Sequence, residues 1–219
     1  MFLEKSISLK ARVWNKSWRS KKQYFIHPFR LVFNWLFIKH VRFLLDDKST
    51  VLEVGCGTAS SLKMLKCKRV GIDFSRSAIS LAKNNINLIL AEACFLPFRN
   101  NVFNLSYAQG LIEHLSFEDR VKVIKEMRRV SYAVVISVPK KGGLLHLAHR
   151  IFIKLRLKWI FADEKYFTED ELSSLLADFT STKTQKFFHM TLIGYGLQSP
   201  LRRPNTKDSE TQKRENQDT

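Results

Sequence analysis

Residues 51–60 have the sequence VLEVGCGTAS, which predicts a short buried strand, a tight glycine turn and the start of a helix. Glu53 comes two residues before the first glycine, so a carboxylate is expected at the carboxyl end of the strand. Gly55 and Gly57 allow the backbone to approach a ligand where a Cβ atom would collide with it. An acid at this point favours a ligand that carries both an amine and a nucleoside, and it disfavours a pyrophosphate.

Beyond residue 50, apolar runs of strand length alternate with helical patterns. The fold class that this predicts is α/β: a Rossmann-like, doubly wound and mostly parallel sheet of seven strands, with helices on both faces. The strands are expected at residues 51–54, 69–72, 87–90, 102–108, 132–138, 182–188 and 190–197, the last two as a hairpin. The helices are expected at residues 28–45, 60–66, 75–83, 117–130 and 168–178. Pro28 should lie in the first turn of its helix, and Thr168 with Glu171 should form a capping box.

The α/β pattern has additions before, within and after it. A basic and aromatic helical extension or cap is expected at residues 1–47, and the α/β domain itself at residues 48–199. A helical insertion at residues 140–165 follows the fifth strand and is rich in apolar, aromatic and basic residues. Residues 200–219 are polar and of mixed charge, which predicts a disordered tail.

The chain is strongly basic, with a net charge of +17. A field of this sign favours anionic partners such as nucleic acid, anionic lipid or an acidic metabolite, although a solvated basic surface explains the charge equally well. The sequence shows no signal peptide and no apolar run long enough to span a membrane. We therefore expect a cytoplasmic protein, with peripheral contact to a membrane as an option, and the sequence sets no oligomeric state.

The cysteines and histidines lack the spacing that is typical of metal sites. Cys56, Cys67 and Cys94 form no CxxC pair, which indicates reduced thiols rather than a zinc site. His146 and His149 would share one face of a helix in the insertion, but they have no further ligands at a suitable spacing. We therefore expect no bound metal.

Acidic or polar residues follow the strands of the predicted sheet, and the carboxyl ends of parallel strands are where ligands bind in such folds. Asp73 ends the second strand, twenty residues after Glu53, where an acid can accept hydrogen bonds from ribose hydroxyls. Glu92 follows the third strand and can accept from the exocyclic amine of a purine, and Gln109 follows the fourth. Each acid alone could be an ordinary solvated carboxylate, but together they predict a nucleoside site.

Five segments, in this order, resemble class I S-adenosylmethionine-dependent methyltransferases of the type 11 group. They are VLEVGCGTAS at 51–60, VGIDFS at 70–75, AEACFLPF at 91–98, VFNLSYAQGLIEHL at 102–115 and YFTEDELSSLLADF at 166–179. The resemblance covers about residues 48–195. It implies an enzyme with S-adenosyl-L-methionine as its cofactor, and the composition of the extension and the insertion favours a small, hydrophobic or anionic acceptor.

The resemblance also implies roles for individual residues. The methionine end of the cofactor would be lined by Glu53, Gly55, Cys56, Gly57 and Gln109. The ribose and adenine would be held by Asp73, Phe74, Glu92 and Ala93, the last through its backbone. His114 would lie near the transferred methyl group, where an imidazole can act as a general base if the acceptor must lose a proton; packing against the following helix is its alternative role. Glu113 is interpreted as a structural or solvated acid.

The chain departs from the family pattern at several places. The third glycine of the first motif is Ala59, where one methyl group can be tolerated at some cost to the close approach of helix and strand. The usual Gly-Asp before the adenine contact is Ala91-Glu92, and the usual Phe-Asp that opens the fourth strand is Phe103-Asn104. None of these changes removes the cofactor site.

The acceptor remains open between three hypotheses. The extension and the insertion are apolar, aromatic and basic, which suits a small acceptor and contact with an anionic membrane surface. An RNA methyltransferase is the second hypothesis, with Trp14, Trp18 and Tyr24 available for base stacking. Against it, no Asn-Pro-Pro-Tyr-like motif follows the fourth strand and no Pro-Cys pair offers a base-attacking thiol. The third hypothesis is a non-catalytic protein that binds the cofactor.

Overall fold

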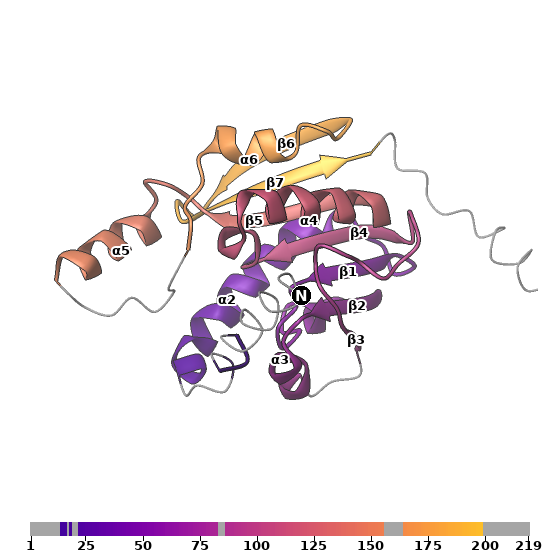
Figure 1. The fold of residues 1–219 in the computed structure, drawn as a ribbon, viewed down its shortest axis with the longest axis horizontal. Helices are drawn as coiled ribbons and strands as arrows, with labels where there is room; N and C mark the ends of the chain where they lie inside the picture. The colour runs from indigo at the N-terminus through magenta and orange to yellow at the C-terminus, as the bar shows by residue number, and fades with distance from the viewer. Residues whose placement is uncertain (1–13, 17, 19–21, 83–85, 156–163, 199–219) are drawn as a thin grey trace, which may run out of the picture.

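A seven-stranded sheet lies at the centre of the molecule in the computed structural model, which describes residues 14–16, 18, 22–82, 86–155 and 164–198 (Figure 1). The strands are β1 (Thr50–Val54), β2 (Lys68–Asp73), β3 (Asn87–Leu90), β4 (Phe103–Gln109), β5 (Ser131–Pro139), β6 (Ser181–Phe187) and β7 (Thr191–Leu197). Their order across the sheet is β3-β2-β1-β4-β5-β7-β6. Strands β1 to β5 pair in parallel, and β7 runs antiparallel to both β5 and β6. The predicted fold class and the closing hairpin are confirmed.

The main helices are α2 (Lys22–Arg42), α3 (Arg76–Leu81), α4 (Phe117–Val130), α5 (Leu144–Lys154) and α6 (Glu169–Leu175). Short 3-10 turns, η1 (Leu62–Met64) and η2 (Ile112–His114), follow β1 and β4. Helix α4 has its predicted bounds, and the Ser116 hydroxyl caps it by accepting from the Asp119 N–H. The predicted capping box of Thr168 and Glu171 is present at the start of α6.

Four of the predicted helices differ from the structure, and the one expected at 75–83 is the shorter α3, which ends at Leu81. The helix expected at 60–66 is reduced to η1, since Ala59 before it has a φ of +54° and Leu65 after it is extended, with φ −97° and ψ 148°. Helix α2 begins at Lys22, so Pro28 lies within it and not in its first turn, at the expense of the one backbone hydrogen bond that proline cannot donate. Helix α6 ends at Leu175, before the predicted residue 178.

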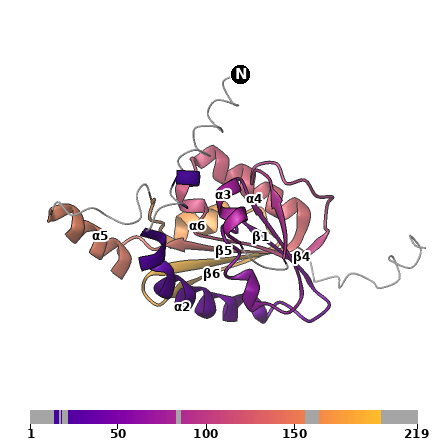
Figure 2. The same ribbon diagram turned by 90° about the horizontal axis from the view of Figure 1, so that it is seen from below.

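Each face of the sheet is covered by its own apolar core. On one face, α4 and α6 bury side chains such as Met127 and Leu172. On the opposite face, α2 buries Phe37 and Val41 together with the residues of η1 (Figure 2). The two cores pack against opposite faces of the sheet. The predicted covering of both faces by helices is confirmed.

Strand β7 packs tightly against the helical layer because it has glycine at two inward positions. A Cβ atom on Gly194 would lie 2.7 Å from Cδ1 of Leu176. A Cβ atom on Gly196 would lie 2.6 Å from Cγ of the Phe179 ring. Such contacts are too short for carbon atoms, so the two glycines allow α6 and the residues after it to approach the sheet.

Helix α5 differs from the other helices because it stands away from the sheet (Figure 1). None of its residues is buried. It forms part of the predicted insertion, of which residues 156–163 lie outside the described residues, as does the predicted tail at 200–219. Among the described helices, none combines the length and the apolar character that crossing a membrane requires.

Candidate functional site

The glycine loop after β1 is tied to the end of β2 by backbone hydrogen bonds. The N–H groups of Gly55 and Cys56 both donate to the carbonyl oxygen of Ile72, at 2.9 and 2.8 Å. The N–H of Gly57 donates to Oδ2 of Asp73 at 2.8 Å. Gly55 and Gly57 have φ values of +74° and +53°, in the left-handed region that glycine adopts without strain. The loop and Asp73 are therefore brought together, as the sequence predicted.

Asp73 also accepts a hydrogen bond at its other carboxylate oxygen, from the Ser75 N–H at 2.7 Å. Burial raises the pKa of Asp73, and the N–H groups of Ser75 and Gly57 oppose that rise. Each carboxylate oxygen has two lone pairs, so both oxygens keep acceptor capacity for a further donor.

Glu53 lies under the same loop and is only 4% exposed. Its Oε1 accepts from the Ser61 hydroxyl at 2.5 Å, and Ser61 in turn accepts from the Tyr107 hydroxyl at 3.1 Å. Its Oε2 has no hydrogen-bond partner among the described residues. Burial raises the pKa of Glu53 to about 8, against the effect of the Ser61 hydrogen bond. Ser61 and Tyr107 were not predicted from the sequence. Tyr107 lies opposite Glu53 in the β1–β4 pairing, so the register of these two strands could have identified it.

Glu53 should make the stability of the protein depend on pH. The folded protein holds a proton on this carboxyl up to about pH 8, whereas the unfolded chain releases it near 4.5, so the free energy of unfolding falls as pH rises between these values. Glu53→Gln stays neutral and can still accept from Ser61. The free energy of unfolding of this variant should therefore fall less steeply with pH than that of the wild type, by up to about 1.4 kcal/mol per pH unit. Urea titrations of both proteins across this range measure the difference. Equal slopes would show that Glu53 is ionised in the folded protein.

The residues predicted around the adenine lie along the neighbouring strand ends. The Ala91 N–H donates to the Asp73 carbonyl oxygen at 3.1 Å, which places the Glu92 turn beside β2. Phe74 and Glu92 are half-buried, and Ala93 packs against the core that contains α4. The side chain of Cys56 differs from the expectation, because it is buried in the opposite core and burial raises the pKa of its thiol. Only the backbone of Cys56 is available to a ligand in the loop.

On the other side of the loop, Gln109 ends β4 and is half-buried. The side chain of Leu111, two residues further on, lies 3.2 Å from the position that a Cβ atom on Gly55 would occupy. The chain just after β4 therefore adjoins the glycine loop, and a role of Gln109 at the methionine end of the cofactor stays a prediction.

Residues 14–16 and 18, here called the N-terminal segment, lie over the glycine loop. A Cβ atom on Gly57 would lie 2.7 Å from the Trp18 ring, so the ring sits directly on the glycine. Oδ1 of Asn15 accepts from the Ser75 hydroxyl at 2.7 Å and from the Ser77 N–H at 3.1 Å. The segment thus contacts both the loop after β1 and the start of α3.

Helix α2 adds contacts to the same cover. The Arg30 guanidinium lies 5.4 Å from the centre of the Trp18 ring, and its charge acts on Glu53. The side-chain amide of Asn34 donates to the Ser60 hydroxyl at 2.8 Å. Both ends of the glycine loop are therefore contacted by residues that precede β1.

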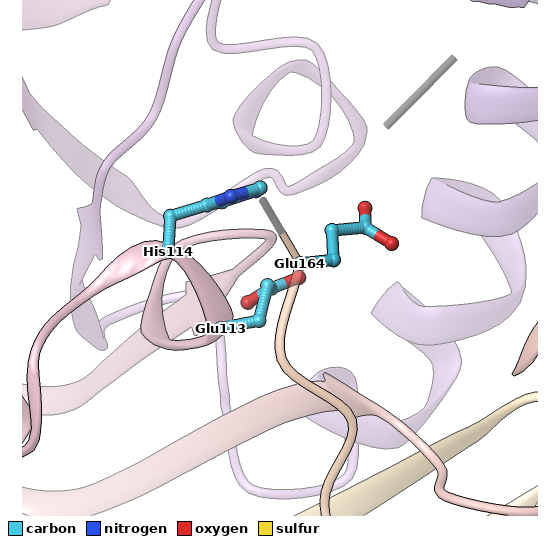
Figure 3. A group of neighbouring side chains, drawn as sticks. All are labelled: Glu113, His114 and Glu164. Atoms are coloured by element: carbon cyan, nitrogen blue, oxygen red, sulfur yellow. The ribbon is translucent and has the colours of Figure 1, made fainter. Parts of the chain in front are cut away.

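A second group of ionisable side chains lies at η2, directly after β4 (Figure 3). One carboxylate oxygen of Glu113, one of Glu164 and a ring nitrogen of His114 lie within 4.8 Å of one another. Burial raises the pKa of Glu113 to about 7. Burial, and then the charge of Glu113, raise the pKa of Glu164 to about 8. Glu113 is a buried acid, 6% exposed, so its interpretation as a solvated one is wrong.

Backbone contacts explain why Glu164 reaches this position, which the sequence did not reveal. The Lys165 N–H donates to the Glu113 carbonyl oxygen at 3.2 Å, and Phe167 forms a bridge with Lys140 at the end of β5. Trp14 contacts His114 edge-on, with ring centres 5.0 Å apart. The N-terminal segment therefore contacts this group as well as the glycine loop.

The two histidines of the insertion have separate partners. Nδ1 of His146 accepts from the Gly142 N–H at 2.9 Å, and Nδ1 of His149 lies 2.9 Å from the Tyr166 hydroxyl. Both rings contact Tyr166. The cysteines at 56, 67 and 94 are free thiols.

Comparison with known proteins assigns this arrangement to a family. Residues 52–132 match the family model described as a methyltransferase domain. This stretch is a class I, type 11 methyltransferase domain. The cofactor expected from the sequence is S-adenosylmethionine, and a solved structure of the same fold, from Thermotoga maritima, is described as a methyltransferase that depends on it. The buried Oε2 of Glu53 has no partner among the described residues and fits the ammonium of that cofactor. The Trp18 ring occupies the space beside Gly57, so close approach of a ligand there requires the ring to move.

The matched relatives resemble only part of the chain. An uncharacterised protein of Methanocaldococcus jannaschii is 35% identical over 89 residues, which are 39% of this chain and 34% of that protein. "Probable tRNA methyltransferase 9B" of Mus musculus is 34% identical over 94 residues, which are 41% of this chain and 21% of that protein. The chain therefore spans about a third or less of the length of these curated relatives.

Solved structures share the fold of the methyltransferase domain over most of the chain. One is an S-adenosylmethionine-dependent methyltransferase of Thermotoga maritima, described as a possible histamine N-methyltransferase. It has a TM-score of 0.65 and 17% sequence identity, over 82% of this chain and 94% of that protein. At this identity the likeness shows a common fold.

Proposed function

We propose that the chain transfers a methyl group from S-adenosylmethionine to a small, hydrophobic or anionic acceptor at an anionic membrane surface. The observation that carries the choice of surface is α5, which has no buried residue and projects beyond the methyltransferase domain. The net charge of +17 adds an attraction to anionic lipid. The methyl transfer itself is supported by the family match and by the geometry at the strand ends.

The strand-end residues have the chemistry that the cofactor needs. The free oxygen of Glu53 can accept from the ammonium group, and the Asp73 carboxylate can accept from the ribose hydroxyls. Glu92 and Ala93 follow β3, where they can meet the adenine edge, and Phe74 lies between them and Asp73 in the chain. A sulfonium is a good leaving group, so the domain needs mainly to align the acceptor with the methyl carbon.

The surface of α5 has the pattern of a helix that lies on a lipid interface. Its apolar residues Leu144, Leu147 and Ile151, with Leu155 directly after the helix, recur at the spacing of one helix face and are 48–61% exposed. The exposed basic residues Arg150 and Lys154 lie within the same stretch. An apolar face with basic neighbours binds anionic membranes through buried apolar area and electrostatic attraction together.

Transfer of radiolabel tests the acceptor class. The protein is incubated with methyl-labelled S-adenosylmethionine and a fractionated cell extract, and we expect label in the lipid or small-molecule fraction. Label in RNA that ribonuclease releases would contradict the proposed acceptor. Binding of S-adenosylhomocysteine without label in any fraction would instead indicate the non-catalytic alternative.

A matched pair of α5 variants tests the membrane surface. Ile151 and Ile153 are both exposed, but they lie on opposite faces of the helix, and only Ile151 belongs to the apolar stripe. Ile151→Glu should lower binding to phosphatidylglycerol vesicles by about tenfold or more, since burial of one such side chain contributes about 1.5–3 kcal/mol. Ile153→Glu, the control, should lower it far less. Equal losses in sedimentation with vesicles would remove the stripe from the proposal.

An RNA acceptor is the second candidate, because a relative with 34% identity over 94 residues is named as a probable tRNA methyltransferase. RNA binding should weaken steeply as salt is added, in proportion to the number of phosphates contacted. Unlike contact with lipid, it should be unaffected by Ile151→Glu.

A further inference from the structure

The cluster at η2 combines three side chains from two distant parts of the chain (Figure 3). Glu113 and His114 belong to η2, and Glu164 comes from the segment that leads into the Phe167 bridge. Their ligand atoms already lie within 4.8 Å of one another. From this geometry we propose that Glu113, His114 and Glu164 bind a divalent metal cation beside the methyl-transfer position.

A second, independent observation points to a ligand. Oε2 of Glu113 is fully buried and has no hydrogen-bond partner among the described residues, and the same is true of Oε2 of Glu164. Arg120, the cation that lies against η2, donates to the carbonyl oxygens of Ile112 and Glu113 and not to a carboxylate. Two buried carboxylate oxygens without partners cost folding free energy unless a cation compensates them.

The ligand set indicates which cation fits. Two carboxylate oxygens and one imidazole nitrogen suit Mn²⁺ or Zn²⁺, whereas Ca²⁺ and Mg²⁺ prefer oxygen ligands alone. The three protein ligands leave further positions open for an acceptor or water. An organic ammonium would bring a single positive charge and leave one of the two carboxylates uncompensated. The hydrogen bond from Lys165 N–H to the Glu113 carbonyl fixes the Glu164 segment, so metal bonds of about 2.0–2.2 Å need only side-chain adjustment.

The chemical consequence rests on the proposed function. A cation here would attract an acceptor that carries an oxygen, orient it and lower the pKa of its O–H proton, which passes to solvent. The acceptor oxygen then forms a bond to the methyl carbon with its lone pair, the bond from that carbon to sulfur breaks, and the electron pair remains on sulfur in S-adenosylhomocysteine. In this arrangement His114 is a metal ligand and not the general base that was expected from the sequence.

Binding of Mn²⁺ tests the proposal without any turnover. Electron paramagnetic resonance of the full chain should show saturable binding of one Mn²⁺ per chain. Glu113→Gln and Glu164→Gln should each weaken binding at least tenfold, because each removes one charged ligand. Glu118→Gln, a change of the same kind at an exposed acid of α4, should leave it unchanged.

Thermal unfolding shows whether the variants are folded, and Mn²⁺ should raise the melting temperature of the wild type but not of the ligand variants. Absence of saturable Mn²⁺ and Zn²⁺ binding by folded protein would overturn the proposal. Unchanged binding in both Gln variants, or binding of a primary amine in place of the metal, would overturn it as well. If S-adenosylhomocysteine binds but Mn²⁺ does not, the metal site fails and the proposed function stands. If the nucleoside does not bind, the proposed function fails, and the metal result is judged on its own.

Discussion

Replacing Asp73 by Ala should lower the affinity for S-adenosylhomocysteine at least about a hundredfold, or about 2.7 kcal/mol. The carboxylate is the acceptor at the carboxyl end of β2 that we assign to the ribose hydroxyls, and hydrogen bonds to charged groups contribute about 1.5–3 kcal/mol each. It also holds the Gly57 N–H and the Ser75 N–H, so the substitution affects the shape of the glycine loop as well as the contact with the nucleoside. Isothermal titration calorimetry measures the loss.

The same substitution should also lower the free energy of unfolding by about 1–3 kcal/mol, because two buried N–H groups lose their acceptor. The calorimetry therefore needs a temperature at which circular dichroism shows folded protein. Asp73→Asn retains an acceptor oxygen and should recover part of the stability but little of the affinity. Asp178→Ala, at an exposed acid beyond α6, is the control and should bind as the wild type does. Wild-type affinity in folded Asp73→Ala would contradict the assignment of the ribose site.

Gly196→Ala should lower the free energy of unfolding by about 2–3 kcal/mol, as expected for overpacking in a core. The new methyl group would lie 2.6 Å from the Phe179 ring, and β7 cannot yield easily because it is hydrogen-bonded to β5 on one side and to β6 on the other. The ring is itself only 6% exposed and has Arg128 over its face. Urea denaturation compares the variant with the wild type.

A second substitution checks that the Phe179 ring is the cause. Phe179→Leu in the Gly196→Ala background should make the combined loss smaller than the sum of the two single losses, because it removes the aromatic edge that the methyl group meets. Additive losses would indicate that the alanine acts through the strand and not through the ring.

Much of the sheet could be predicted from the sequence because its signals are local. β3 and α4 have their predicted bounds. An apolar run defines β3, and the Ser116 cap defines the start of α4, without help from distant residues. The positions of Glu53 and Asp73 followed from the rule that parallel strands end at one edge. The carboxylate of Asp73 does meet the glycine loop there.

The features that escaped prediction depend on backbone conformation or on distant contacts. The short η1 lies between the positive φ of Ala59 and the extended backbone of Leu65, which a pattern of apolar residues does not reveal. Glu164 reaches η2 only because the Lys165 N–H bonds to the Glu113 carbonyl, across fifty residues of sequence. The burial of Glu113 is likewise a result of tertiary packing around η2, because an acidic residue shortly after a loop glycine is expected at the surface.

The N-terminal segment has a consequence for the kinetics of the protein. Trp18 contacts Gly57, Asn15 contacts the start of α3 and Trp14 contacts His114, so the N-terminal segment covers both the loop that we assign to the nucleoside and the group at η2. Under the proposed function, the nucleoside and the acceptor would both lie beneath this segment, so exchange of either one would require its displacement.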